Sequence, residues 1–135
     1  MILDAEKAHG LVRGLGLCLQ SENSGIDPEF FYYYYAYGQM EAAGRIRHGE
    51  PIDVCVPTGN FGNILAGCYG ALMGLPVGNF LCASNENNVL TQALNEGYYN
   101  SRRPFYKTIS PSMDILVSSN FERFVYLHSG NDPEY

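Results

Sequence analysis

The sequence predicts an α/β fold built around one βαβ unit, and the order of three segments indicates it. A short β-type run at residues 52–56 is followed by a glycine-containing loop, a helical pattern at 63–73 and a second β-type run at 77–83. Strand, tight loop, helix and strand in this order form parallel strands joined by a right-handed crossover. The length of 135 residues suits one domain. We therefore expect a parallel βαβ unit at about residues 52–83.

Residues 1–50 are expected to form a helical lead-in to this unit. Apolar residues recur at helical spacing over 3–19, although three glycines lower the helix propensity there by about 1 kcal/mol each. A second helix should begin at Asp27, a favoured N-cap residue, because Pro28 fits the first helical position. This helix should end before Gly44.

The second helix would contain seven aromatic residues among the eight positions 30–37. Such a run covers every face of a helix, so we expect it to be buried in a core or an interface. A strand is the alternative, because aromatic residues are enriched in strands. A ladder of tyrosines could also stack on bases or sugars, but stacking surfaces of that kind are combined with basic grooves. This chain has 8 basic and 14 acidic residues and a net charge of −6, which argues against a nucleic-acid partner.

The helix predicted at 63–73 should bury one apolar face and end at Gly74 and Pro76. The residues expected on that face are Ile64, Leu65, Cys68, Ala71 and Leu72. Further along the chain, the pattern predicts a polar capping segment at 84–88, a helix at 89–95 closed by Gly97, a loop at 98–104, a short strand at 115–117 and a last helix at 121–128.

The cysteines and histidines do not have the spacing of a metal site. No Cys-x-x-Cys pair occurs, and the residues are dispersed: Cys18, Cys55, Cys68, Cys82, His9, His48 and His128. Zinc sites normally contain closely spaced ligand pairs. Because the cysteines have apolar neighbours, we expect reduced, buried thiols in a cytoplasmic protein. The first residues have no signal-peptide pattern, and no apolar run reaches the ~20 residues that span a bilayer.

The loop between the first strand and its helix carries the clearest chemical prediction. It reads Thr58, Gly59, Asn60, Phe61, Gly62 and Asn63. The first turn of a helix has unpaired N–H groups and a partial positive charge, and glycines let the main chain approach a ligand closely. Hydroxyl and amide side chains would add donors, so the loop could bind a phosphate ester. A purely structural βα turn is the alternative. The Walker and dinucleotide-binding glycine patterns do not match.

Three stretches together resemble the threonine synthase family, whose members are pyridoxal-phosphate enzymes of the tryptophan-synthase-β-like fold. They are VPTGNFGNILAGCYGALMGLPV, CASNENNVL and KTISPSMDILVSSNFERFVY. The resemblance is collinear from about Pro57 to Pro133. It implies a three-layer fragment of the large domain of a fold-type-II enzyme, a single partial domain over 1–135, with a helical lead-in at 1–50 and the phosphate-loop unit and following segments at 51–135.

The resemblance also implies a cofactor and a reaction. In that family the loop grips the phosphate of pyridoxal 5′-phosphate, and the matching positions here are Gly59, Asn60, Phe61, Gly62 and Asn63. Many relatives carry Asp where this chain has Asn63. The family converts O-phospho-L-homoserine and water to L-threonine and phosphate, with the cofactor as electron sink.

No residue of the chain is predicted to be catalytic. A Schiff-base lysine in this family lies upstream of the phosphate loop in a Phe-Lys-Asp-like setting. Lys107 is downstream of the loop, and Lys7 has none of the expected neighbours. We therefore expect an internal piece of a longer enzyme that is inactive alone. Two alternatives remain, a non-catalytic α/β module that binds a small phosphate-bearing ligand and a chain that self-associates through exposed apolar surface.

Other polar residues have two interpretations each. Asp114 could lie near the cofactor or cap a local turn. Asn85 and Glu86 follow a strand end, which is the ligand side of open α/β sheets, but they could instead cap a helix. Arg102 and Arg103 could attract a phosphorylated substrate or simply be solvated.

Overall fold

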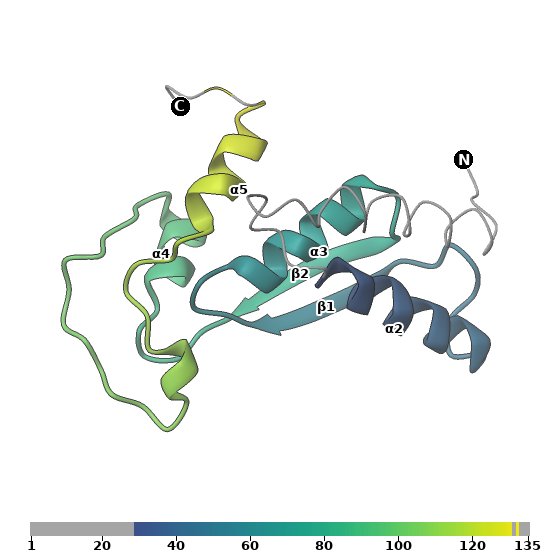
Figure 1. Ribbon diagram of the computed structural model, residues 1–135, viewed down its shortest axis with the longest axis horizontal. Helices are drawn as coiled ribbons and strands as arrows, with labels where there is room; N and C mark the ends of the chain where they lie inside the picture. Colours follow the sequence, from purple (N-terminus) through teal and green to yellow (C-terminus); the bar gives the residue numbers. More distant parts are fainter. Residues whose placement is uncertain (1–28, 131, 133–135) are drawn as a thin grey trace, which may run out of the picture.

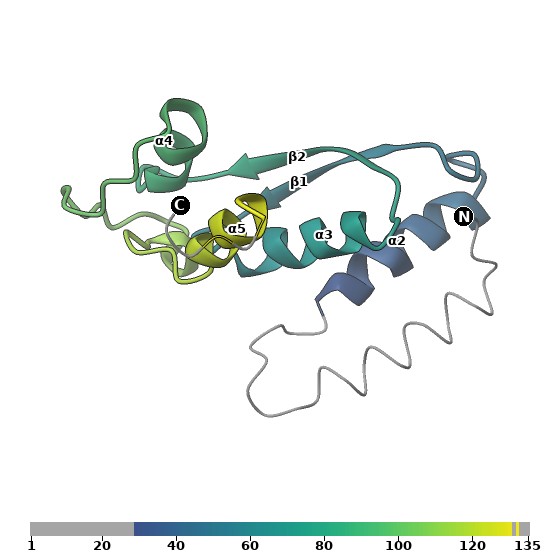
Figure 2. The same cartoon turned by 90° about the horizontal axis from the view of Figure 1, so that it is seen from above.

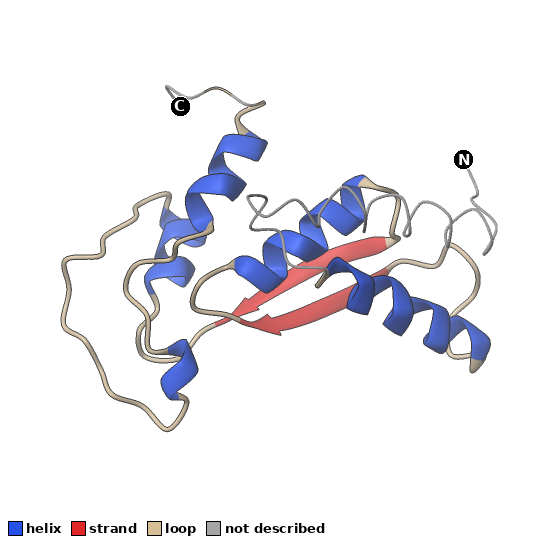
Figure 3. Ribbon diagram, in the orientation of Figure 1, coloured by secondary structure: helices blue, strands red, loops and turns tan. Residues whose placement is uncertain are grey.

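The computed structural model describes residues 29–130 and 132, and the helix expected at 3–19 and the Asp27-Pro28 helix start lie outside them. The described elements follow one another around a parallel strand pair (Figures 1 and 3). They are α2 (Phe30–Ala42), β1 (Ile52–Pro57), α3 (Gly62–Leu72), β2 (Val77–Ala83), α4 (Val89–Glu96), the 3-10 turn η1 (Pro111–Met113) and α5 (Phe121–His128).

The centre of the fold is the βαβ unit that the sequence predicted. β1 and β2 pair in parallel, with Ile52 opposite Val77 and Pro57 opposite Ala83, and α3 connects them. Figure 2 shows α2 and α3 on one side of the two strands and α4 toward the other side, beyond the end of β2. The α/β fold class and the parallel pairing are therefore confirmed.

The buried face of α3 contains Ile64 and Leu65, as predicted, together with three small residues that were not predicted. Its buried residues are Ile64, Leu65, Ala66, Gly67 and Gly70. A Cβ atom at Gly67 would lie 2.7 Å from the Phe80 ring and 2.8 Å from the Tyr33 ring, so the glycine allows β2 and α2 to close around the helix. The prediction for Leu72 was wrong, because this side chain is 69% exposed. Cys68 and Ala71 are only partly buried.

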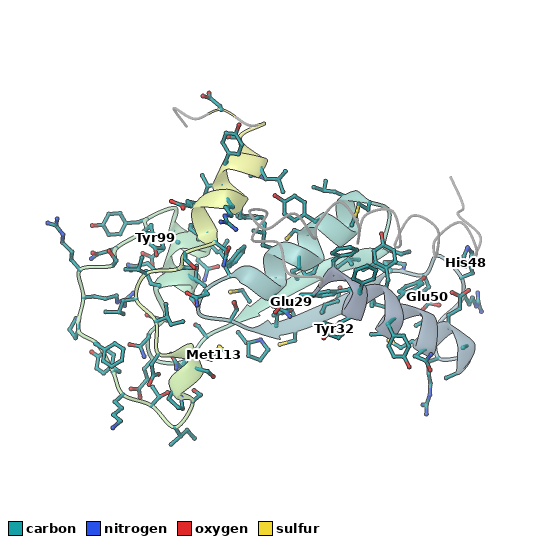
Figure 4. All side chains as sticks on the ribbon, viewed as in Figure 1. Glu29, Tyr32, His48, Glu50, Tyr99 and Met113 are labelled. Atoms are coloured by element: carbon teal, nitrogen blue, oxygen red, sulfur yellow. The ribbon has the colours of Figure 1, made fainter. Side chains whose placement is uncertain are left out.

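The aromatic run is helical, as predicted, but it is buried on one face only. Phe30, Tyr33 and Tyr37 are buried, whereas Tyr32 is 70% and Tyr35 is 68% exposed. The helix ends where the sequence indicated, before Gly44, which has a positive φ of 65°. The hydroxyl of Tyr37 donates to the carbonyl oxygen of Glu50, 3.0 Å away, which ties the end of α2 to the start of β1. Figure 4 shows Glu50 and His48 beside this end of α2.

The segment between α4 and α5 contains no regular strand. The helix closed by Gly97 (φ 68°) and the last helix are confirmed, but the strand predicted at 115–117 was wrong. The backbone N–H of Ile115 donates to the carbonyl oxygen of Met113, 2.9 Å away, so the segment begins in a local turn and not in a strand.

The thiols are less uniformly buried than expected. Cys68 and Cys82 are partly buried, and burial raises the pKa of both thiols. Cys55 was wrongly predicted to be buried, because it lies on the face of β1 opposite Val56 and is exposed. Within the described ranges, no three His, Cys, Asp or Glu side chains form a cluster that could hold a metal ion. The helices described there are also too short or too polar to cross a membrane.

Candidate phosphate-binding site

The loop predicted to bind phosphate connects the end of β1 to the start of α3, and Phe61 fixes its shape. Phe61 immediately precedes the helix and has a positive φ of 64°, the left-handed region that bulky residues rarely adopt. Its ring is only 2% exposed and packs against Phe121 and Phe124, with ring centroids 5.3 and 5.1 Å away. Burial of the ring in this core holds the strained backbone in place, so Phe61 can offer a ligand only its main chain.

Thr58 stabilises the loop from inside. Its backbone N–H donates to the carbonyl oxygen of Ala83 on β2, 3.0 Å away, and its Oγ1 accepts the N–H of Phe61 at 3.0 Å. The residue is 5% exposed. The oxygen of this hydroxyl closes the turn as an acceptor, and its O–H proton is still a candidate donor for a ligand, as the sequence suggested.

The main candidate donors for a ligand are backbone N–H groups in the first turn of α3. Leu65 is the first residue whose N–H finds an acceptor in this turn, the carbonyl oxygen of Phe61 at 3.0 Å. The N–H groups of Gly62, Asn63 and Ile64 have no acceptor among the described residues. The first turn contains no acidic residue. Three unpaired donors and the positive end of the helix dipole make this turn suitable for an anion.

The side chain of Asn63 is bound to α2. The hydroxyl of Tyr33 lies 2.6 Å from Asn63 Oδ1 and 3.1 Å from the Asn63 carbonyl oxygen. Burial, with smaller contributions from Cys68 and Glu29, raises the pKa of Tyr33 to about 12, so the hydroxyl keeps its proton and donates at neutral pH. Because Oδ1 faces Tyr33, the Nδ2 group of Asn63 points the other way and remains a candidate donor.

The two loop glycines lie close to side chains of a neighbouring segment. A Cβ atom at Gly59 would lie 3.0 Å from the Ile115 side chain, and one at Gly62 would lie 3.2 Å from Asn120 Nδ2. Asn120 also donates two hydrogen bonds to the carbonyl oxygen of Asn60, from its backbone N at 3.1 Å and from Nδ2 at 3.2 Å. Asn120 was not predicted from the sequence to belong to the site. The only signal was its place directly before the α5 helix.

A second polar cluster forms around Asp114 at the end of β2. Its carboxylate accepts from the backbone N–H and the hydroxyl of Thr108, at 2.9 and 2.7 Å, and from the amides of Asn85 and Asn87, at 2.8 and 3.1 Å. The Thr108 N–H and hydroxyl, followed by the Asn85 and Asn87 amides, hold the pKa of Asp114 below its usual value. Asp114 thus fastens the 108–110 loop to the strand end.

The same cluster settles the local role of Asn85. Its Oδ1 accepts the backbone N–H of Asn87 at 2.9 Å, and its Nδ2 donates to Asp114. Asn88 is the N-cap of α4 but makes no side-chain capping bond. The predicted capping segment therefore holds the 108–110 loop through the bonds of Asn85 and Asn87 to Asp114. Glu86 is exposed and lies outside this set of bonds.

The basic residues lie at the edge of this region. Arg102 is exposed, and Arg103 donates to Gln92 Oε1 on α4 over a long 3.4 Å. Lys107 is exposed in the loop before Thr108, and Lys7 lies outside the described residues. Among the described residues, the candidate donors at the start of α3 are neutral groups, and Arg123 donates to Asn120 beside the loop at 3.2 Å.

Comparisons with known proteins identify relatives of this chain. Human threonine synthase-like 1 is 47% identical over 122 residues, which are 87% of this chain and 16% of that protein. Threonine synthase of Saccharomyces cerevisiae is 41% identical over 107 residues, which are 75% of this chain and 20% of that protein. The chain belongs to the threonine synthase family. It spans about a fifth of the length of these relatives, and no protein-family model matches it.

A solved threonine synthase has the same architecture. The crystal structure of the pyridoxal-phosphate-bound enzyme from Brucella melitensis superimposes with a TM-score of 0.68 at 40% sequence identity. The match covers 79% of this chain and 22% of the Brucella chain. The α/β fold described above is therefore that of a threonine synthase segment, of fold type II.

Proposed function

We propose that this chain is the threonine synthase segment that grips the phosphate of pyridoxal 5′-phosphate, through Gly59, Asn60, Phe61, Gly62 and Asn63. The unpaired N–H groups of Gly62, Asn63 and Ile64 carry the proposal, because they converge at the positive end of α3. The Brucella enzyme was crystallised with pyridoxal phosphate bound, which supports the same cofactor here.

The donor set fits a phosphate ester. A phosphate dianion needs several N–H donors and no nearby carboxylate, and the first turn of α3 offers backbone donors without an acidic residue. When bound, pyridoxal phosphate would supply an electron sink for proton removal from an amino-acid substrate. The described residues supply binding and orientation, and the only described lysine, Lys107, lies in an exposed loop. We therefore infer that conversion of O-phospho-L-homoserine to L-threonine requires the rest of the enzyme.

Calorimetry with three ligands tests the phosphate grip. Pyridoxal phosphate and inorganic phosphate should bind to the chain, whereas pyridoxal, which lacks the phosphate, should not. Asn60 is exposed in the loop, so Asn60→Asp places a carboxylate beside the bound anion and should weaken binding at least about tenfold by repulsion. Asn95→Asp makes the same charge change on the exposed side of α4 and should leave binding unchanged. Absence of heat with both phosphate ligands would reject the proposal.

The inactivity of the chain alone has a separate test. Borohydride reduction after incubation with pyridoxal phosphate should leave no covalent adduct detectable by mass spectrometry, because a Schiff-base lysine is normally desolvated or beside another cation. A stoichiometric adduct mapped to Lys7 would overturn this part of the proposal.

A second candidate function is a non-catalytic module for a small phosphate-bearing ligand. The backbone N–H groups at the start of α3 favour it, because such donors can bind any phosphate ester. In that case a simple sugar phosphate should bind as tightly as pyridoxal phosphate. A clear preference for pyridoxal phosphate would favour the cofactor-binding segment instead.

A further inference from the structure

Asn120 has the position of a helix cap but bonds elsewhere. It is the N-cap residue of α5, yet its side chain accepts no hydrogen bond from a backbone N–H in the first turn of that helix. Its backbone N–H and its Nδ2 group both donate to the carbonyl oxygen of Asn60, a residue 60 positions earlier in the chain. Two donors on one acceptor tie the start of α5 to the middle of the phosphate loop.

These bonds restrain the peptide unit between Asn60 and Phe61, which comes directly before the first N–H groups of α3. The unit between Asn60 and Phe61 is held at its carbonyl oxygen by Asn120 and at its N–H by Thr58 Oγ1. A peptide unit is planar, so restraints at both ends fix its orientation. Together with burial of the Phe61 ring, that orientation holds Phe61 at its left-handed φ of 64°, directly before the N–H groups of Gly62 and the following residues.

The amide of Asn120 is itself held in the orientation that makes Nδ2 the donor. Arg123, one turn into α5, donates from Nη1 to Asn120 Oδ1 at 3.2 Å. With Oδ1 used in this way, Nδ2 faces the loop. It lies so close to Gly62 that a Cβ atom there would be 3.2 Å away. The amide therefore also occupies the space beside the first residue of α3.

We propose that Asn120 is a positioning residue for the phosphate loop. It holds the Asn60–Phe61 peptide so that the first N–H groups of α3 converge on a phosphate, and it acts through that peptide. This inference rests on the proposed function for its ligand, but the effect on loop geometry can be measured separately in the ligand-free chain.

Asn120→Ala and Asn120→Asp in the 135-residue chain test the proposal. Alanine removes the Nδ2 donor, and aspartate keeps the shape but replaces the donor with a charged acceptor. One net hydrogen bond of about 1 kcal/mol corresponds to about fivefold in affinity. We expect Asn120→Ala to weaken binding of pyridoxal phosphate about fivefold by calorimetry, and Asn120→Asp to weaken it more. Asn79→Ala, which removes an exposed amide donating to Asp53 on the strands, is the matched control and should not change binding.

Amide exchange in the ligand-free chain separates positioning from stability. The N–H of Phe61 should exchange faster in Asn120→Ala, and the Phe61 and Gly62 amide resonances should shift, while the α5 amides stay unchanged because no side-chain cap is lost. Unaltered affinity of Asn120→Ala would overturn the proposal, as would a loss that the unfolding midpoint fully explains. If the wild-type chain binds no phosphate, the proposed function fails. Unchanged Phe61 exchange would then overturn the positioning role as well, and faster exchange would support it as a role in loop geometry.

Discussion

Tyr33 on α2 and Asn63 in the first turn of α3 are joined by a 2.6 Å hydrogen bond from the tyrosine hydroxyl to the amide oxygen. The same hydroxyl is 3.1 Å from the Asn63 carbonyl oxygen. The aromatic run, whose purpose the sequence left open, therefore contacts the candidate site directly. Tyr33 orients the Asn63 amide in the way that Asn120 orients the peptide two positions earlier.

Replacement of Tyr33 by phenylalanine should remove this hydrogen bond and keep the ring in the core. The ring remains buried, but Asn63 loses its donor, so we expect a loss of about 1 kcal/mol in the free energy of unfolding, with up to about twice that if the buried oxygen stays unpaired. Urea denaturation measures the change. Tyr32→Phe removes an exposed hydroxyl from the same helix and should have no measurable effect.

Tyr33 should also make the fold sensitive to alkaline pH. Its pKa is raised from 10.0 to about 12 in the folded chain, so stability is fully present below pH 10 and falls as the pH rises toward 12. The slope from this one group is at most about 1.4 kcal/mol per pH unit. Denaturation of the wild type and Tyr33→Phe at about pH 9 and about pH 11 tests this, and an equal loss in both chains would assign the effect to other groups.

Two glycine-to-alanine substitutions should have opposite signs. At Gly67 a Cβ atom would lie within 3 Å of the Phe80 and Tyr33 rings, so Gly67→Ala should destabilise the chain by about 1–3 kcal/mol through overpacking. Gly38 lies within α2 with nothing within 4 Å of its Cβ position, and Gly38→Ala should stabilise by about 0.5–1 kcal/mol through helix propensity. Thermal or urea unfolding reports both, and destabilisation by Gly38→Ala would contradict the geometry of α2.

Asp114 should control how tightly the loop before it is held. Asp114→Asn gives up the charge that accepts the four bonds from Thr108, Asn85 and Asn87, so the 98–110 loop should open more often. Trypsin cleavage after the exposed Lys107 should accelerate about fivefold. Asp53→Asn makes the same chemical change on β1 and should leave the cleavage rate unaltered.

The charge of Asp114 also gives an acid dependence with a defined sign. Its pKa lies below the ordinary 3.8 in the folded chain, so its stabilising effect is present above about pH 4 and is lost as the pH falls through the lowered pKa. Cleavage by an acid protease should rise below about pH 4 in the wild type and show less pH dependence in Asp114→Asn. The same rise in both chains would place the effect elsewhere.

The helices and strands of this fold were predictable where hydrophobic periodicity and turn residues matched the contacts made in the folded chain. The βαβ unit, the helical nature of the aromatic run and the glycine ends at Gly44, Gly74 and Gly97 followed from periodicity and turn chemistry. Leu72 was misplaced because helical spacing alone cannot tell which face meets a neighbouring helix. The segment at 115–117 was misassigned because its apolar residues resemble a strand, whereas the backbone N–H of Ile115 is used in a turn.

The candidate site was predictable in position but not in detail. The strand–loop–helix order located the unpaired N–H groups at α3, since every helix start has them. The contacts of Asn120 with Asn60, and of Tyr33 with Asn63, join residues 60 and 30 positions apart, and no local pattern encodes such pairs. Likewise, the roles of Thr58 and Asp114 depended on which neighbours the fold brings near.

The two strands have a consequence for handling the protein. Within the described residues β1 and β2 pair only with each other, so each has an outer edge of open backbone donors and acceptors. Such edges can recruit strands from other molecules, and exposed Leu81 on β2 adds apolar surface beside one of them. Concentrated samples of the chain should therefore form larger particles over time, and light scattering across a dilution series sets the range in which binding constants are meaningful.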